Sequence, residues 1–278
     1  MEIFEYSFFR NALAGLALVS VASAIIGTYV VVRRLMFVTG GITHACFGGL
    51  GLGYYAGVNP MAAAAVFAVA SALGVEWMSG KCRLREDSAI SVVWALGMAI
   101  GVIFIFLTSG YVPELNSFLF GNLLTISKTD LWIFGAFLAV LLLLMTLFYR
   151  PIVACAFDAD YARTINLPVR SVNGVMIVMV SVCVVLTLKL IGIMLLMSLF
   201  AIPQMIAEVF TSRLKPMMVL ASVTSLVCSV AGLFVSYVAN VPASATIVVT
   251  LIAAYFLVKI AAGTKRRGKA AIKTGKER

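Results

Sequence analysis

The sequence predicts an all-α fold, a polytopic bundle of membrane-spanning helices, and three observations support this. Of its 278 residues, 63% are hydrophobic and only 12% are charged. The mean hydropathy is +1.09, well outside the range of a soluble domain. Apolar windows of about 20 residues, the length that crosses a bilayer, recur between charged or turn-rich breaks. The chain is therefore expected to fold within a lipid bilayer.

Nine apolar windows are candidates for spanning helices. They cover residues 10–32, 37–57, 60–78, 88–108, 131–149, 172–188, 190–210, 217–238 and 243–260. Neither a Ser- or Pro-rich linker nor a soluble insertion interrupts them. We therefore expect a single membrane domain over residues 1–262, followed by a basic cytoplasmic tail over residues 263–278.

The basic residues predict the orientation of the spans, because short cytoplasmic loops retain Lys and Arg. They gather after every second window, at Arg33, Arg34, Lys81, Arg83, Arg85, Arg150, Arg163, Arg170, Arg213 and Lys215, and in the tail. The N-terminus is therefore expected outside and the C-terminus in the cytoplasm. Since the net charge of +10 comes mainly from these loop markers and the tail, we expect contact with anionic lipid and no nucleic-acid partner.

Two longer stretches do not span. Residues 109–130, on the predicted outer side, contain an apolar run at 118–125 that is too short to cross the bilayer and predicts a re-entrant or interfacial segment. Residues 150–171, on the inner side, contain a short helix with Asp158 or Asp160 as its N-cap and with Asn166 in the left-handed conformation that closes a helix. This short helix is either a connector lying on lipid or a lever moved by a cytosolic partner.

Small residues recur every four positions in the second window, at Gly41, Ala45, Gly49, Gly53 and Gly57. On a helix this spacing forms one slowly drifting stripe, along which a neighbouring backbone can approach closely. The stripe therefore predicts close helix packing.

His44, the only histidine of the chain, lies beside this stripe. Burying an imidazole away from water is costly unless it finds a partner. It is therefore either a hydrogen-bonded interior residue or a ligand for a transition-metal ion, which imidazole suits. With one histidine and scattered cysteines, a structural zinc cage is excluded, and Cys46, two residues away, points elsewhere on a regular helix.

Several stretches, taken in order, resemble the membrane permease family of bacterial metal-ion ABC transporters, which import zinc, manganese or ferrous iron. They are Arg33-Arg34, Thr43-His44-Ala45 with its glycine run, and residues 86–94, 119–124, 160–163, 190–203 and 241–244. The resemblance implies a homodimeric permease in the bacterial inner membrane. It also implies a cytosolic ATP-binding subunit and an extracytoplasmic metal-binding receptor as partners, with the metal ion as cargo and no permanently bound cofactor.

The resemblance favours the lever interpretation of the short inner helix. It implies that Asp158, Asp160, Tyr161, Ala162, Arg163 and Asn166 contact the ATP-binding subunit. No Gly-rich phosphate loop ending in Gly-Lys-Ser or Gly-Lys-Thr occurs in the sequence. ATP hydrolysis is therefore expected on a separate chain, and this chain is expected to be no enzyme.

Two positions depart from the family pattern. Family members commonly carry an aspartate one helical turn before the histidine, where this chain has Gly40. His44 would then act with backbone carbonyls, water or Cys46, or the cargo is not the usual divalent ion. In the coupling loop, Asn166 stands where a glycine is usual, which is a mild change because Asn tolerates the same backbone region.

The expected function is therefore the permease subunit of an ABC importer for a divalent transition-metal ion, zinc or manganese, with His44 as a transient ligand in the permeation path. An ion-coupled secondary transporter is the alternative, although neither the deep charge pair nor the internal repeat typical of that class is evident. A membrane-embedded enzyme is disfavoured, because a single histidine without a carboxylate at metal-site spacing makes no catalytic constellation.

Overall fold

The computed structural model describes residues 6–81, 84–109, 118, 120–121 and 123–275, with the backbone alone at 124 and 263–275. Within these ranges every regular element is a helix. The helices are α1 (Ser7–Val32), α2 (Met36–Ala56), α3 (Pro60–Lys81), α4 (Glu86–Leu107), the 3-10 helix η2 (Leu123–Thr125), α6 (Lys128–Leu147), α7 (Tyr149–Phe157), α8 (Ala159–Thr164), α9 (Val169–Ile191), α10 (Ile193–Phe210), α11 (Leu214–Ala239) and α12 (Ala243–Gly275).

The predicted all-α membrane bundle is confirmed. Nine helices in the described part of the chain have 18 residues or more, one for each predicted window, and eight of them are long and apolar enough to cross a membrane. The ninth, α2, is less hydrophobic because six of its 21 residues are glycine. Since most of α2 is buried among other helices, it does not need a lipid-compatible surface all round.

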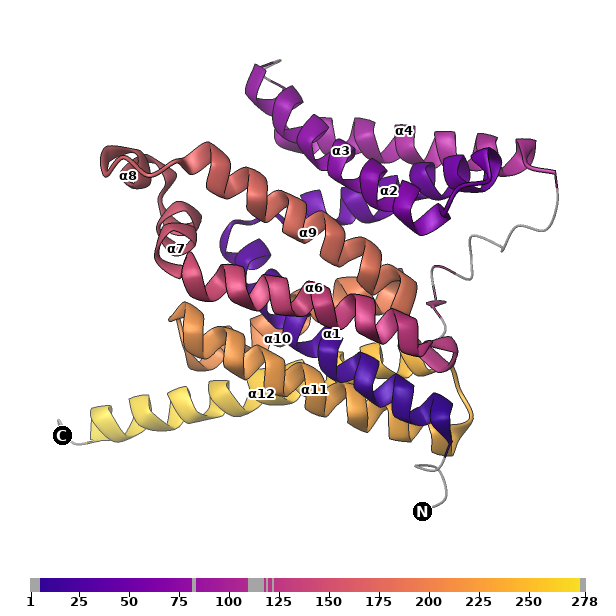
Figure 1. Ribbon diagram of the computed structural model, residues 1–278. Helices are drawn as coiled ribbons and strands as arrows, with labels where there is room; N and C mark the ends of the chain where they lie inside the picture. The colour runs from indigo at the N-terminus through magenta and orange to yellow at the C-terminus, as the bar shows by residue number, and fades with distance from the viewer. Residues whose placement is uncertain (1–5, 82–83, 110–117, 119, 122, 276–278) are drawn as a thin grey trace.

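The long helices are arranged in three groups (Figure 1). Helices α2, α3 and α4 pack together on one side, and α10, α11 and α12 pack together on the other. Helices α1, α6 and α9 contact one another and form the third group. Within it, α9 contacts both α2 and α3, whereas α1 packs mainly on α10 and α11. The short helices α7 and α8 lie at one end of the bundle, where the predicted cytoplasmic loops also meet.

The boundary between α9 and α10 differs from the prediction, which placed the break at Lys189. Helix α9 continues through Lys189 to Ile191, and Gly192 ends it with φ of +79°. A lysine is tolerated in the last turn because its ammonium forms an ion pair with Asp130 of α6, at an end of the helix where a positive charge also suits the helix dipole. The turn between the two helices therefore lies at Gly192 and not at the charged Lys189.

Only part of the predicted outer re-entrant segment is described, since residues 110–117, 119 and 122 lie outside the described ranges. The end that is described packs on the bundle: Leu123 and Ile126 are buried, and the side-chain amide of Asn11 donates a hydrogen bond to the carbonyl of Ile126 over 3.0 Å. Gly121 also contacts Gly192, and a Cβ atom at Gly121 would lie 2.4 Å from the amide nitrogen of Gly192. This contact joins the outer segment to the α9–α10 turn.

The inner stretch contains one helix more than predicted. The span predicted over residues 131–149 ends at Leu147, and Arg150 and Pro151 after it lie in the first turn of the separate helix α7. A proline is acceptable there because the first amides of a helix have no intrahelical acceptor. At the C-terminus, the backbone of α12 continues as a helix past residue 262 into the predicted tail.

Candidate functional site

His44 lies in the middle of α2, and its side chain is half-buried. Its ring stacks on Trp94 of α4, with 4.2 Å between the ring centroids and an angle of 5° between the planes. No described residue forms a hydrogen bond with the imidazole. The stacked indole covers one face of the ring, so a ligand would approach the imidazole at the edge that carries its two nitrogen atoms.

The small residues of α2 bring its backbone against two neighbours. A Cβ atom at Gly51 would lie 2.4 Å from the carbonyl oxygen of Gly101 on α4, and one at Gly49 would lie 2.6 Å from the carbonyl oxygen of Ala63 on α3. The members of the predicted stripe divide in the same way: Gly41 and Ala45 face α4, whereas Gly49 and Gly53 face α3.

The stripe turns from one neighbour to the other because four residues advance a helix by about 40° beyond a full turn. Gly57 does not take part in this packing. It is the residue after the helix, with φ of +67°, and no described atom lies within 4 Å of where its Cβ would be. Gly57 ends α2 in the left-handed conformation that glycine favours.

Gly40 lies one turn before His44, and a side chain from α10 approaches it. The methyl carbon of Met197 would lie 3.3 Å from a Cβ atom at Gly40, and the Met197 sulfur is 3.9 Å from the hydroxyl oxygen of Thr43. A methionine thioether therefore occupies the position beside the turn that precedes His44. Neither Met197 nor the stacking role of Trp94 was predictable from the sequence, because contacts between helices that are distant along the chain leave no local pattern.

Cys46 is directed away from this region. Its side chain is fully buried, and its sulfur lies 3.0 Å from the carbonyl oxygen of Ile42 on the preceding turn of α2. Its thiol is therefore held against its own helix rather than beside His44. Over the described residues there is also no group of three or more His, Cys, Asp or Glu side chains that would hold a metal ion.

Helix α8 is the second candidate region, and its N-terminus is capped by Asp158. One carboxylate oxygen accepts hydrogen bonds from the backbone amides of Asp160 and Tyr161, over 3.0 and 2.9 Å. Of the two predicted N-cap residues, the structure therefore selects Asp158. Because a helix of six residues has no stability of its own, this cap and the packing below α8 hold it in place.

The C-terminus of α8 is closed by Asn166, whose φ of +57° confirms the predicted left-handed conformation. The amide of Leu167 donates to the carbonyl of Ala162 over 3.0 Å, the hydrogen bond that is typical of a left-handed helix end. Ala162 is fully buried with Cys155 and Val169. Burial raises the pKa of the Cys155 thiol, so it stays protonated at neutral pH and contributes packing.

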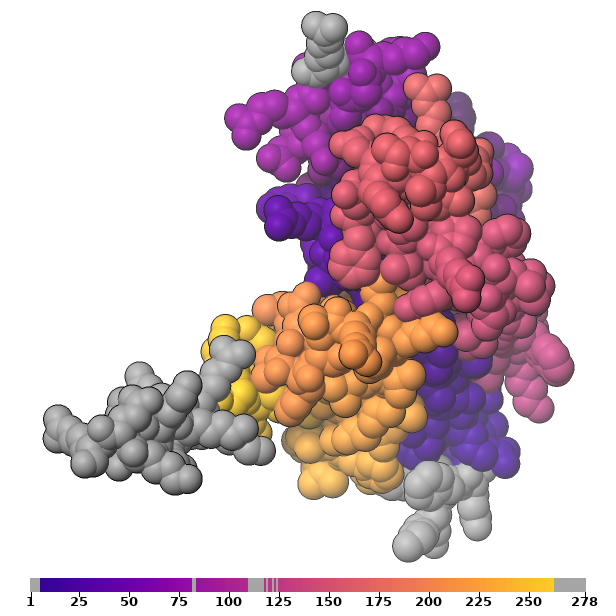
Figure 2. Space-filling view, turned by 90° about the vertical axis from the view of Figure 1, so that its left-hand side faces the viewer, coloured from indigo at the N-terminus to yellow at the C-terminus, as the bar shows by residue number. Residues whose placement is uncertain are grey.

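The other face of α8 is exposed. Tyr161 is largely open to solvent, and Asp160 forms an ion pair with Arg163 over 2.6 Å on the surface. Figure 2, which views the molecule from the end where α7 and α8 lie, shows this segment at the surface of that end. The arrangement presents an aromatic ring and a charged pair on a short helix that is capped at both ends.

A hydrogen bond connects this unit to the transmembrane core. The guanidinium of Arg33, directly after α1, donates to the carbonyl oxygen of Cys155 in α7 over 3.1 Å. From the sequence, Arg33 was expected only to mark the cytoplasmic end of the first span. In the structure it also links the end of the central helix α1 to the helix pair that carries the predicted coupling residues.

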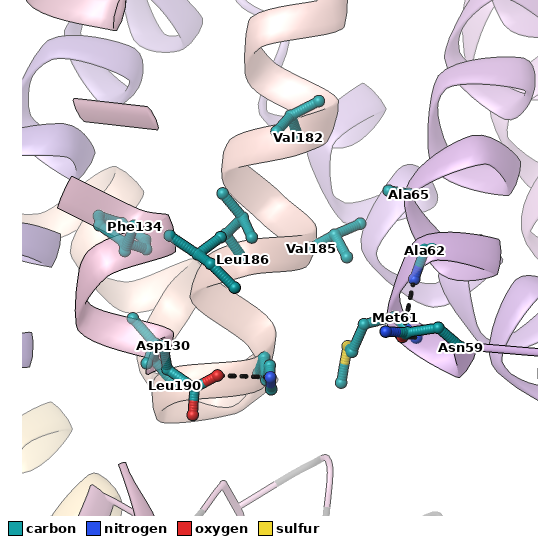
Figure 3. Close-up of a pocket in the computed structure, with 12 residues that line it drawn as sticks. Asn59, Met61, Ala62, Ala65, Asp130, Phe134, Val182, Val185, Leu186 and Leu190 are labelled. Carbon is teal, nitrogen blue, oxygen red and sulfur yellow. Dashed lines mark hydrogen bonds and ion pairs between the residues drawn. The ribbon is translucent and has the colours of Figure 1, made fainter. Parts of the chain in front are cut away.

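A cavity of about 260 Å3 lies elsewhere, between α3, α6 and α9 (Figure 3). Its walls are mainly apolar, with Val185, Leu186 and Phe134 among them, and the ion pair of Lys189 with Asp130 lies at its edge. His44 does not line it. This cavity therefore belongs to the packing between helices near the predicted outer end, and it is separate from the His44 region.

Comparisons with known proteins agree with this architecture. The model of a family described as the ABC 3 transport family matches residues 5–262. The chain is 37% identical to an uncharacterised membrane protein of Synechocystis sp. over 257 residues, covering 92% of each chain. It is 30% identical to a protein of Halalkalibacterium halodurans named manganese transport system membrane protein MntC, covering 89% of this chain and 85% of the relative.

A solved structure has the same fold. The structure titled PsaBC from Streptococcus pneumoniae in complex with Fab superposes with a TM-score of 0.83 at 26% identity, covering 92% of both chains. The family model covers almost the whole membrane bundle, including His44, α8 and the α9–α10 turn. The chain therefore belongs to the ABC 3 transport family and is the membrane permease of an ABC transporter.

Proposed function

We propose that this permease imports a divalent transition-metal ion, zinc or manganese, and that His44 is a transient ligand in the ion path. The observation that carries the proposal is the placement of the only histidine: it lies in the middle of a buried helix, stacked on Trp94, with no described hydrogen-bond partner. An interior histidine retained for structure is expected to hydrogen-bond. Relatives named as manganese transport proteins support a metal cargo.

The proposed mechanism is alternating access. Neutral imidazole binds the ion from its open edge and releases it when the central helices reorient, and a single ligand per permease suits a path that must bind weakly enough to release. In a homodimer two copies of His44 would face one path. The dimer would lie in the bacterial inner membrane, with the N-terminus outside and the basic tail over residues 263–278 in the cytoplasm.

ATP hydrolysis would take place on a separate cytosolic subunit that contacts α8. Its candidate contact residues are Asp158, Asp160, Tyr161, Ala162, Arg163 and Asn166. In this proposal Ala162 anchors the helix and Tyr161 meets the partner, because the first is buried and the second is exposed. Movement of α8 would reach α1 through the hydrogen bond between Arg33 and Cys155. An extracytoplasmic receptor would deliver the ion to the opposite end.

Co-expression with a candidate ATPase subunit and a candidate receptor from the same organism tests the assignment. We expect the three proteins to form a complex whose ATP hydrolysis in nanodiscs rises when the receptor carries Zn2+ or Mn2+. ATP-dependent uptake of either ion into proteoliposomes would complete the demonstration. Metal uptake by this chain alone, driven by an ion gradient and without the ATPase, would contradict the proposal and support a secondary transporter.

A further inference from the structure

We infer that the thioether of Met197 is a second donor beside His44, and that it biases the path toward soft ions such as Zn2+ and Cd2+ at the expense of Mn2+. This inference rests on the proposed role of His44 in the ion path. It adds a specificity-determining residue on a different helix, and it concerns which ion passes rather than whether one does.

The geometry places the end of the Met197 side chain against the turn of α2 that precedes His44. Residues 40 and 44 are neighbours on one face of α2, because positions four apart lie above one another on a helix. Gly40 contributes no side chain to that face, and the methyl group of Met197 lies where the first carbon of a side chain at residue 40 would make contact. The sulfur itself approaches the adjacent Thr43, 3.9 Å from its hydroxyl oxygen.

The donor atoms near His44 are of a kind that favours soft ions over manganese. Imidazole suits zinc, copper, iron and nickel, thioether sulfur prefers soft ions, and manganese prefers carboxylate, carbonyl and water oxygen. No described acidic residue forms a hydrogen bond or an ion pair with His44, and Asp130 in the first turn of α6, for example, is paired with Lys189. The described side chains therefore bring one nitrogen, one sulfur and the hydroxyl of Thr43 to this turn, and no carboxylate. That hydroxyl is already engaged, since it donates to the carbonyl of Thr39 over 2.7 Å.

The partial exposure of His44 and Met197 is consistent with an ion passing beside them. His44 and Met197 are both partly accessible, whereas Thr43 and Gly40 between them are buried. A thioether is neutral and binds without releasing a proton, so it adds affinity for a soft ion without the charge that would hold a divalent ion too long. The stacked Trp94 leaves the edge of the imidazole as its route to a ligand.

A methionine at this place also has a purely structural explanation, since its flexible side chain fills irregular gaps in a core. The two explanations differ in what they predict for Met197→Leu. Leucine has nearly the same volume and keeps the packing, but it removes the sulfur. A structural role leaves the preference among ions unchanged, whereas a donor role changes it.

The experiment compares uptake of Zn2+, Cd2+ and Mn2+ at limiting concentration into proteoliposomes that contain the complete transporter with its ATPase and receptor. Because zinc binds almost any nitrogen, oxygen or sulfur site more tightly than manganese, the readout is the change in the ion ratio between variants with the same receptor. Loss of even an indirect partner of a metal ligand costs about 10- to 100-fold in affinity. We therefore expect Met197→Leu to lower Zn2+ and Cd2+ uptake by about tenfold and to leave Mn2+ uptake nearly unchanged.

Two further variants make the result decisive. Met205→Leu, an exposed methionine on the same helix, should leave all three rates unchanged. Gly40→Asp supplies a carboxylate against the flexible end of Met197 and should raise Mn2+ uptake relative to Cd2+.

An equal fall for all three ions in Met197→Leu, or no change for any, would overturn the inference while leaving the proposed function standing. If the wild-type transporter moved none of the three ions, the proposed function would fail, and this inference with it.

Discussion

Helix α8 and the surroundings of His44 are both candidate functional regions, and they are built in opposite ways. The ends of α8 are set by residues of its own segment, since Asp158 caps the first turn and Asn166 closes the last. The surroundings of His44 come from other helices: Trp94 of α4 stacks on its ring, and Met197 of α10 approaches the preceding turn at Gly40 and Thr43. One region is a local structure placed at an end of the bundle, and the other exists only when three helices pack together.

This difference predicts how each region responds to mutation. Changes within α8 should alter a short segment and its partner contact, and leave the bundle intact. Changes at the α2–α4 contact should instead disturb packing over a large part of the membrane domain, because close-packed helices relax poorly around an added atom. Variants that break this rule would show that the two regions are less distinct than the structure indicates.

The largest effect is expected from Gly51→Ala. The added carbon would lie 2.4 Å from a backbone oxygen of α4, so the two helices must separate, at a cost of about 1–3 kcal/mol or more. The melting temperature of the purified transporter should fall by several degrees, and the yield of folded complex should fall with it. Thermal unfolding in detergent measures both.

Gly74→Ala is the matched control for that variant. It lies inside α3, and no described atom is within 4 Å of where its Cβ would be. Alanine favours a helix over glycine by about 1 kcal/mol, so stability should be unchanged or slightly higher. Equal destabilisation by the two substitutions would show that the glycines of α2 are not needed for close approach.

An intermediate effect is expected from Asn166→Val, because residue 166 has φ of +57°. A left-handed conformation costs an L-residue about 1–2 kcal/mol, and a β-branched side chain is least tolerant of it. ATP turnover per ion transported should rise as coupling is lost, while the melting temperature of the bundle stays the same. Asn166→Gly keeps the conformation and should retain coupling, and loss of coupling in the glycine variant would show that the amide itself is required.

A smaller effect is expected from Asp158→Ala, which removes the cap of α8. Loss of an N-cap costs about 0.5–2 kcal/mol, confined here to a six-residue helix. Hydrogen exchange at residues 159–164 should speed up, and α2 should exchange as in the wild type. Asp158→Ser restores an acceptor and should restore protection. Faster exchange throughout the bundle would contradict the local character of α8.

The same contrast explains how much was predictable from sequence. The spanning helices, the N-cap choice at Asp158 or Asp160 and the closing role of Asn166 follow from local patterns, and the structure bears them out. Helix α7 was not predicted, because a proline is equally typical of the residues after a helix and of the first turn of a new one, and Pro151 lies in a first turn. The break between α9 and α10 was predicted at the charged Lys189, whereas the helix ends at Gly192, the residue with a φ of +79°.

The His44 region was predictable only in part. Its histidine and the small residues beside it are visible in the sequence, but the partners of each are not. The stripe changes neighbour halfway, from α4 to α3, and this depends on how three helices pack. Met197 is 153 positions from His44, and no spacing rule connects the two. Arg33 was recognised for its charge and not for its hydrogen bond to α7.

Uptake by His44→Ala is the most direct test of the account. The variant should assemble with the ATPase and receptor as the wild type does, since the imidazole has no described hydrogen bond and one stacking contact to lose. We expect ATP-dependent Zn2+ and Mn2+ uptake into proteoliposomes to fall to background, because the path loses its nitrogen ligand. Uptake at the wild-type rate by a fully assembled variant would contradict the claim that the ion passes His44.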